Sequence, residues 1–225
     1  MKKIILATTL ALCVNSAFAA PSTVLQVKGL LTNAACTPSL GNGGVVDYGV
    51  IHLAELSATE VNQLGHKDID LTISCTAPTK VSWNMVDDRE QSRAGVAVED
   101  GTFVGETMTI SSRLYGVGTT TAGGEKIGNY SLFVKTDSVE ADGNVVDSIS
   151  QLSGAPNWTK NVNGSTMGYN AVDFTVAAAG TVEPLAFKEA TFPLVTSLAI
   201  KDTATLAITD DTPLDGQITI SLKYL

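Results

Sequence analysis

The residues best suited to chemistry in this sequence are three cysteines and two histidines. Cys13 falls within a segment that we expect to be removed, which leaves Cys36 and Cys75 in the mature chain. Thiols of an exported protein meet an oxidising compartment, so this pair is predicted to form a disulfide worth about 3 to 4 kcal/mol. The alternative is a catalytic or metal-binding pair. It is disfavoured because the two cysteines lack CxxC spacing and no His cluster accompanies them.

The histidines and carboxylates give no stronger signal for catalysis. His52 and His66 are isolated from each other in sequence, and isolated histidines are more often surface groups than ligands. The acidic stretch 137–147 lacks the residue order of a calcium loop, and its Asp-Gly pair is typical of a hairpin turn. Nothing nominates a carboxylate pair for glycoside hydrolysis. We therefore expect a protein that is not an enzyme, with no catalytic residues, metal or cofactor.

The amino terminus predicts export. Two lysines, an apolar run and the sequence Ala17-Phe18-Ala19 are typical of a secretory signal peptide, here residues 1–19. No later segment is apolar and long enough to predict a membrane span. The formal net charge of -9 argues against nucleic acid as a partner, because nucleic acid binds basic surfaces.

The mature sequence predicts an all-β domain, because alternating apolar residues recur and helical periodicity is absent. Residues 68–75 and 80–86 are expected to form consecutive antiparallel strands, with Val81, Trp83 and Met85 facing the core. Further strands are expected at 106–112, 127–134, 171–177, 194–200, 203–209 and 216–225. The polar, Gly-rich residues 99–180 are interpreted as an enlarged middle insertion within one domain.

Three stretches in this order, "KGLLTNAACTPSLGNGG", "LGHKDIDLTISC" and "DGQITISLKYL", resemble the fimbrial subunits of the chaperone/usher pathway. Within that family, "VDYG", "LTISCTAPT", "KIGNYS" and "TFPL" are similar to the enterobacterial GltF-like group of fimbrial-like periplasmic proteins. The resemblance implies an immunoglobulin-like pilin sandwich that lacks its last strand. A groove would then lie beside the carboxy-terminal strand.

In that family, a strand from a periplasmic pilus chaperone or from another fimbrial subunit completes the groove, and an outer-membrane usher assembles the fibre. Carried over to this chain, the groove-edge strand would consist of Ile218, Ile220, Leu222 and Tyr224, with the carboxylate of Leu225 anchored in the chaperone. A host surface receptor would be a further partner.

The candidate donor strand is short. Thr23, Leu25 and Val27 alternate within residues 20–28, the expected amino-terminal extension. Residues 29–225 are expected to form the pilin-like domain, with 27–31 in its first strand. Since a groove one strand long takes about 5 to 8 residues, polymerisation through this extension is in question.

The sequence therefore predicts a non-catalytic fimbrial or fimbrial-like structural subunit that contributes to cell adhesion, exported to the periplasm and, if assembled, displayed in a cell-surface fimbrium. The alternative is a self-complemented periplasmic binding protein of the same fold that does not polymerise, in which an extra middle strand fills the groove.

Overall fold

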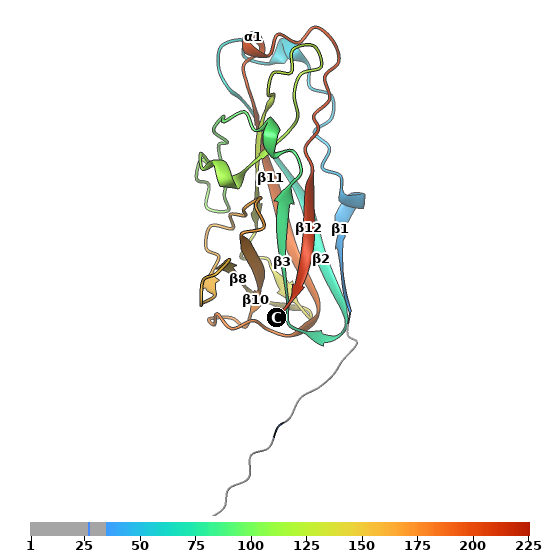
Figure 1. Cartoon of the computed structure of the whole chain (residues 1–225), viewed down its shortest axis with the longest axis vertical. Helices are drawn as coiled ribbons and strands as arrows, with labels where there is room; N and C mark the ends of the chain where they lie inside the picture. The colour runs from blue at the N-terminus through green and yellow to red at the C-terminus, as the bar shows by residue number, and fades with distance from the viewer. Residues whose placement is uncertain (1–26, 28–34) are drawn as a thin grey trace, which may run out of the picture. The chain divides into compact units, whose positions relative to one another are not determined.

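A computed structural model describes Val27 and residues 35–225 of the chain (Figure 1). The predicted signal peptide and, apart from Val27, the predicted extension lie outside the described residues. Residues 35–225 form two β-sheets in which every strand pairing is antiparallel, and a shared apolar core lies between them. The predicted all-β sandwich is confirmed.

The first sheet is built around two long strands. Its order is β1-β2-β11-β5-β4, and β6 pairs with β11 and β7. These strands are β1 (Cys36–Leu40), β2 (Asn62–Thr79), β4 (Leu114–Gly116), β5 (Gly128–Val134), β6 (Glu140–Ala141), β7 (Asn144–Val145) and β11 (Phe187–Ile200). The pairing of β2 with β11 shifts register between Leu198 and Ala199, opposite Gly65, whose φ of 76° suits glycine. Beyond that bulge, β11 continues to Ile200.

The second sheet has the order β12-β3-β10-β8-β9. Its strands are β3 (Val81–Asp87), β8 (Asp147–Leu152), β9 (Thr159–Lys160), β10 (Val172–Ala177) and β12 (Ile218–Tyr224). Val81, Trp83 and Met85 are fully buried, as their alternation predicts. The indole of Trp83 stacks on Phe174 with ring centroids 4.8 Å apart, so aromatic packing joins β3 to β10.

Three expectations about the strands are wrong. Residues 68–75 and 80–86 lie in β2 and β3 as consecutive strands, but these belong to different sheets and do not pair with each other. Residues 106–112 form no strand, because Met108 makes only one bridge, to Val98, and a 3-10 turn follows. Residues 203–209 contain a short helix instead, because the Asp202 carboxylate caps it by accepting the Thr205 N–H at 2.8 Å.

Helical segments are short throughout the described residues. The helix α1 spans Thr203–Leu206, and four 3-10 turns span Gly41–Gly44, Leu53–Glu55, Glu90–Ser92 and Ser111–Arg113. Within Val27 and 35–225, no helix combines the length and apolarity that crossing a bilayer requires.

Candidate functional site

The carboxy-terminal strand β12 is an edge of the second sheet, and among the described residues β3 is its only strand partner. The side chains of Ile218, Ile220 and Leu222 are half-buried and pack against the main core, whereas Thr219 and Ser221 are exposed. This is the alternation that the sequence predicts for residues 218–222. The strand therefore contributes apolar side chains to the interior while one of its backbone edges is left without a strand.

The register identifies the backbone groups that lie on the free edge. Gln217 accepts from the Asp88 N–H, and the Leu225 N–H donates to Lys80, so odd-numbered residues of β12 bond to β3. In an antiparallel pair the intervening residues direct their N–H and C=O groups away from the partner. Ile218, Ile220 and Leu222 thus present unpaired backbone groups and core-facing side chains together.

The edge strand of the first sheet on this side, β1, is less suited to accept a strand. Ala35 accepts from the Thr76 N–H, so Cys36, Pro38 and Leu40 direct their backbone groups away from β2. Pro38 has no N–H to donate. The Cys36 N–H donates to the Tyr224 hydroxyl at 2.9 Å. The free edge of β12 is therefore the stronger template.

An apolar groove lies between the two edges. Its narrow part has a volume of about 240 Å³ and is lined on one side by Leu40 and Val46 and on the other by Leu214, Ile218 and Ile220. Its floor is formed by side chains of the first sheet and of the segment before β5: Ile69, Val117, Tyr130, Leu132, Leu194, Thr196 and Leu198. Apolar side chains from both sheets are thus accessible along one line.

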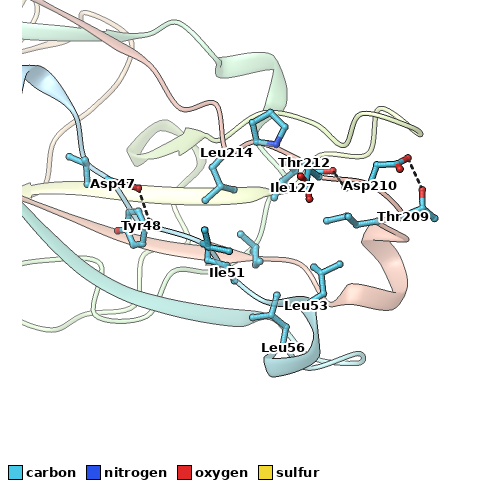
Figure 2. Close-up of a pocket in the computed structure, with 17 residues that line it drawn as sticks. Asp47, Tyr48, Ile51, Leu53, Leu56, Ile127, Thr209, Asp210, Thr212 and Leu214 are labelled. Atoms are coloured by element: carbon cyan, nitrogen blue, oxygen red, sulfur yellow. Dashed lines mark hydrogen bonds between the residues drawn. The ribbon is translucent and has the colours of Figure 1, made fainter.

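The groove continues beyond β12 into a wider part of about 680 Å³ (Figure 2). Val46, Tyr48 and Leu214 line both parts, so the two parts adjoin each other. One wall of the wide part is the segment 46–56 and the other is the segment 208–214, with Ile127 and Ile200 between them. Neither wall belongs to a β-strand.

Tyr48 fixes the segment 46–51 to the floor of the groove. Its hydroxyl lies 2.9 Å from Thr196 Oγ1 and donates to the backbone carbonyl of Thr196 at 3.2 Å. Burial raises the pKa of Tyr48, and the hydrogen bond to Thr196 partly offsets this. Burial likewise raises the pKa of Tyr130. Both phenols are therefore neutral at physiological pH and serve as packing groups.

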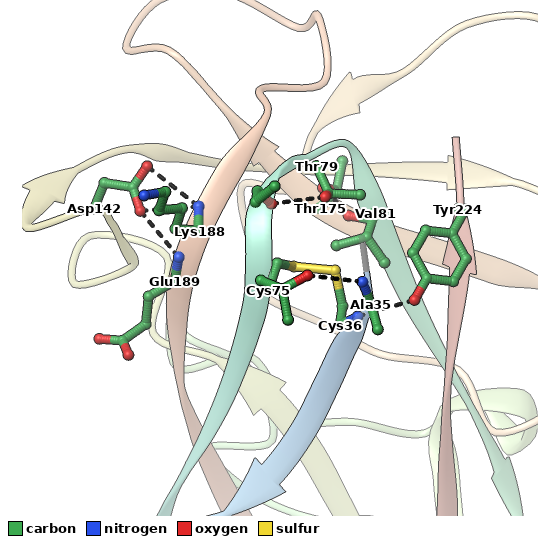
Figure 3. The surroundings of a disulfide bond; sticks show 12 residues. Ala35, Cys36, Cys75, Thr79, Val81, Asp142, Thr175, Lys188, Glu189 and Tyr224 are labelled. Carbon is green, nitrogen blue, oxygen red and sulfur yellow. Dashed lines mark hydrogen bonds between the residues drawn. A yellow bond between two sulfur atoms is a disulfide. The ribbon is translucent and has the colours of Figure 1, made fainter. Parts of the chain in front are cut away.

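At the other end of the groove, β1 and β12 are joined beside a disulfide (Figure 3). Cys36 and Cys75 form the predicted bond, across a directly opposed β1–β2 pair whose Cα atoms are 4.0 Å apart. Tyr224 reaches across from β12 to Cys36. The predicted residue Leu225 is 47% exposed, so the terminal residue is accessible.

Charged groups hold the beginning of β12 in place. Arg89 makes a bidentate ion pair with Asp215, with Nε–Oδ2 at 2.8 Å and Nη2–Oδ1 at 3.1 Å. This contact with Arg89 lowers the pKa of Asp215. Nearby, the buried Asp87 carboxylate accepts from Arg93 Nε at 2.8 Å and from the Gly116 N–H at 3.1 Å. These contacts tie the loop after β3 to both sheets.

The remaining predicted residues lie elsewhere. His52 is exposed next to a 3-10 turn, and His66 Nε2 lies 2.9 Å from the carbonyl oxygen of Asp100, so the two histidines do not share a site. Among the described residues, no three His, Cys, Asp or Glu side chains are grouped in a way that could hold a metal ion. Thr23 and Leu25 lie outside the described residues. Val27 is 91% exposed and in no strand.

Sequence reasoning missed the two walls of the wide part. The segment "VVDYGVI" does alternate, with Val46, Tyr48 and Val50 in phase, and this was the available signal. The other wall, residues 208–214, carries two aspartates and a proline and has no strand pattern. Only tertiary structure brings these segments to one groove.

Comparison with known proteins places the chain among bacterial relatives. A family model described as "Protein of unknown function (DUF1120)" matches residues 25–131. The chain is 30% identical over 250 aligned residues to "Protein GltF" of Escherichia coli K12, covering 97% of each chain. It is 29% identical over 229 residues to "Uncharacterized protein YhcF" of the same organism, covering 93% of each.

Proposed function

Because this chain belongs to the same protein family as Protein GltF, we propose that it is an exported, non-catalytic structural subunit of fimbrial type that a β-strand from another chain completes. The observation that carries the proposal is the free backbone edge of β12 above an apolar groove. Such an edge recruits strands, and adding a strand to it is an established mode of peptide recognition.

The proposed strand would lie between β12 and β1, with its alternate side chains in the narrow part of the groove. It would pair with the backbone of Ile218, Ile220 and Leu222, and its inward side chains would contact Leu40 and Val46. The fold would then be an immunoglobulin-like pilin sandwich whose last strand is supplied by a periplasmic pilus chaperone or a neighbouring fimbrial subunit. Usher-dependent display in a fimbrium and a role in adhesion belong to the same proposal.

The alternative, in which an extra strand of the middle insertion fills the groove, has no support in the strand pairings. Within the described residues, the strands β4 to β10 have partners in the two sheets, and none of the insertion's strands pairs with β12. The insertion instead extends the sheets on the side away from β1.

Amide hydrogen exchange of the mature chain, starting at residue 20, tests the proposal. Without a partner, the amides of Ile218, Ile220 and Leu222 should exchange fast, while those of Thr219 and Ser221 are protected by β3. Co-purification with a periplasmic pilus chaperone should protect all five. Protection of the even-numbered amides in the isolated monomer would contradict the proposal, because the groove would then already be filled.

A matched pair of variants separates groove binding from surface charge. Ile220→Asp places a carboxylate in the groove, whereas Ser221→Asp places one on the exposed face of the same strand. We expect the first to abolish chaperone binding and the second to preserve it. Retained protection of β10 amides in both variants would show that the sandwich is folded. Equal binding by both folded variants would argue against the groove as the binding site.

A further inference from the structure

The wide part of the groove has the form of a slot for a chain end. Residues 46–56 and 208–214 form its two walls, and among the described residues no backbone–backbone hydrogen bond involves 46–51 or 208–214. Two of their backbone groups have side-chain partners: the Gly49 N–H donates to Asp47 Oδ1, and the Asp210 carbonyl accepts from the Thr212 hydroxyl. The other backbone groups on the two sides of the apolar floor favour an extended chain between them. The floor belongs to a separate cluster that includes Ile127, Leu198 and Ile200. A strand paired with β12 would therefore continue past Ile218 into this space.

The charged side chains that line the wide part are all acidic. Its lining carries the carboxylates of Asp47, Asp210 and Asp211 and no Lys, Arg or His side chain. All three aspartates are exposed. None of them takes part in an ion pair among the described residues, whereas several other exposed carboxylates do. In Figure 2, Asp47 lies beside Tyr48 and Asp210 lies at the opposite end of the wide part.

We infer that the wide part of the groove selects a completing strand by its end: a bulky apolar residue on the floor, followed by basic residues next to Asp210 and Asp211. This inference rests on the proposed function, since it names the chemistry of the strand that the groove accepts. The wide part has nearly three times the volume of the narrow part and so has room for a bulky apolar side chain. The basic residues complement carboxylates that form no ion pair within the described part of the chain.

The occupant with this chemistry is another protein. Residues 20–34 of this chain contain a single basic residue, Lys28, in mid-segment, and no aromatic residue. The equivalent segment of a second copy therefore offers neither an aromatic side chain nor a cluster of positive charge. A donor strand of different sequence fits the wide part better.

Titration with synthetic peptides tests the inference on the mature, folded chain. Three types of peptide share one apolar alternation and one Phe near the end, and they differ only in whether a Lys-Lys, Gln-Gln or Glu-Glu pair follows that Phe. Each type is made in two forms, with the pair at the amino or at the carboxy terminus. A fourth peptide has the sequence of residues 20–33. Binding is measured by calorimetry, and its location by protection of the Ile218, Ile220 and Leu222 amides.

We expect the Lys-Lys peptide to bind about three- to tenfold more tightly than the Gln-Gln peptide at low salt, with the Glu-Glu peptide weakest. The difference should vanish near 1 M salt. Asp210→Asn/Asp211→Asn should abolish it. The control Asp137→Asn/Glu140→Gln removes two charges near the opposite end of β11 and should preserve it.

The outcomes are distinguishable. Equal affinity of all three designed peptides, with the β12 amides protected, would overturn the inference and leave the proposed function intact. Binding of the 20–33 peptide as tightly as the Lys-Lys peptide would also overturn it, since a second copy would then be the better occupant. Protection of the β12 amides by no peptide would overturn both.

Discussion

Replacing both disulfide cysteines, as Cys36→Ala/Cys75→Ala, should destabilise the isolated domain by about 4 kcal/mol. The bond joins residues 39 apart in sequence, and closing a loop of that length in the unfolded chain accounts for about 4 kcal/mol in the chain-entropy model. About 190 folded residues give an unfolding entropy near 400 cal/mol/K, so the melting temperature should fall by about 10 °C.

The assay is thermal and urea unfolding of the mature chain, with the reduced wild-type protein as the matched control. Reduction removes the same constraint without changing the residues, so the reduced protein and the double variant should agree within about 1 kcal/mol. Loss of the disulfide should also loosen β1, in which the Cys36 N–H donates to the Tyr224 hydroxyl. A double variant that melts within 2 °C of the oxidised wild type would refute the reasoning, because the bond would then not constrain the unfolded chain.

Three further predictions concern the framework around the groove. Asp87→Asn leaves its buried guanidinium partner uncompensated and should cost about 3 to 5 kcal/mol in urea unfolding, whereas removal of the exposed Glu183 in Glu183→Gln should cost less than about 1 kcal/mol. Gly128→Ala would place a Cβ 2.1 Å from a backbone oxygen of β11 and should destabilise the domain by at least about 1 to 3 kcal/mol. In the control Gly123→Ala, the nearest atom to the new Cβ is 3.6 Å away, so the change should be close to neutral. Thermal melting of both variants checks this. The pKa of Asp215 is lowered in the folded state, so the stability that this ion pair contributes is present above the ordinary aspartate pKa of 3.8 and is lost as pH falls through the folded-state pKa. Asp215→Asn should therefore flatten the decline of stability below about pH 4. An unchanged pH profile of stability would argue against that ion pair.

The sequence predicts the strands whose two faces differ. In β12 one face is half-buried and the other is exposed, and in β3 apolar side chains alternate with Ser82 and Asn84, so alternation is visible in the residue pattern of both strands. The disulfide is also predictable, because the expected removal of Cys13 would leave Cys36 and Cys75 as a pair. The sheet to which a strand belongs is not encoded in its alternation, which is why β2 and β3 appear to be a hairpin although the chain crosses between sheets.

The errors at 203–209 and in the wide part of the groove have a different physical origin. At α1, one hydrogen bond that the Thr205 N–H donates to the Asp202 carboxylate outweighs the β-propensity of the threonines. The walls of the groove lie outside the β-strands, and one of them includes the 3-10 turn Leu53–Glu55. Neither alternation nor turn chemistry identifies the other wall, 208–214. Their proximity depends on β11 and on the loop that follows it.

The edges of the two sheets differ in a way that bears on the proposed function. The edge strands β4 and β9 have three and two residues, and β1 has Pro38 on its free side, so each is a poor template for another strand. The strand β12 has seven residues, no proline, and core-facing Ile218, Ile220 and Leu222. Lys223 is its only charged side chain, and it is held by Asp173 at 2.7 Å. Among the described residues, the other edge strands are short or carry a proline, so the isolated chain should associate through β12. Its concentration-dependent association should be suppressed by Ile220→Asp and not by Ser221→Asp, as measured by analytical ultracentrifugation.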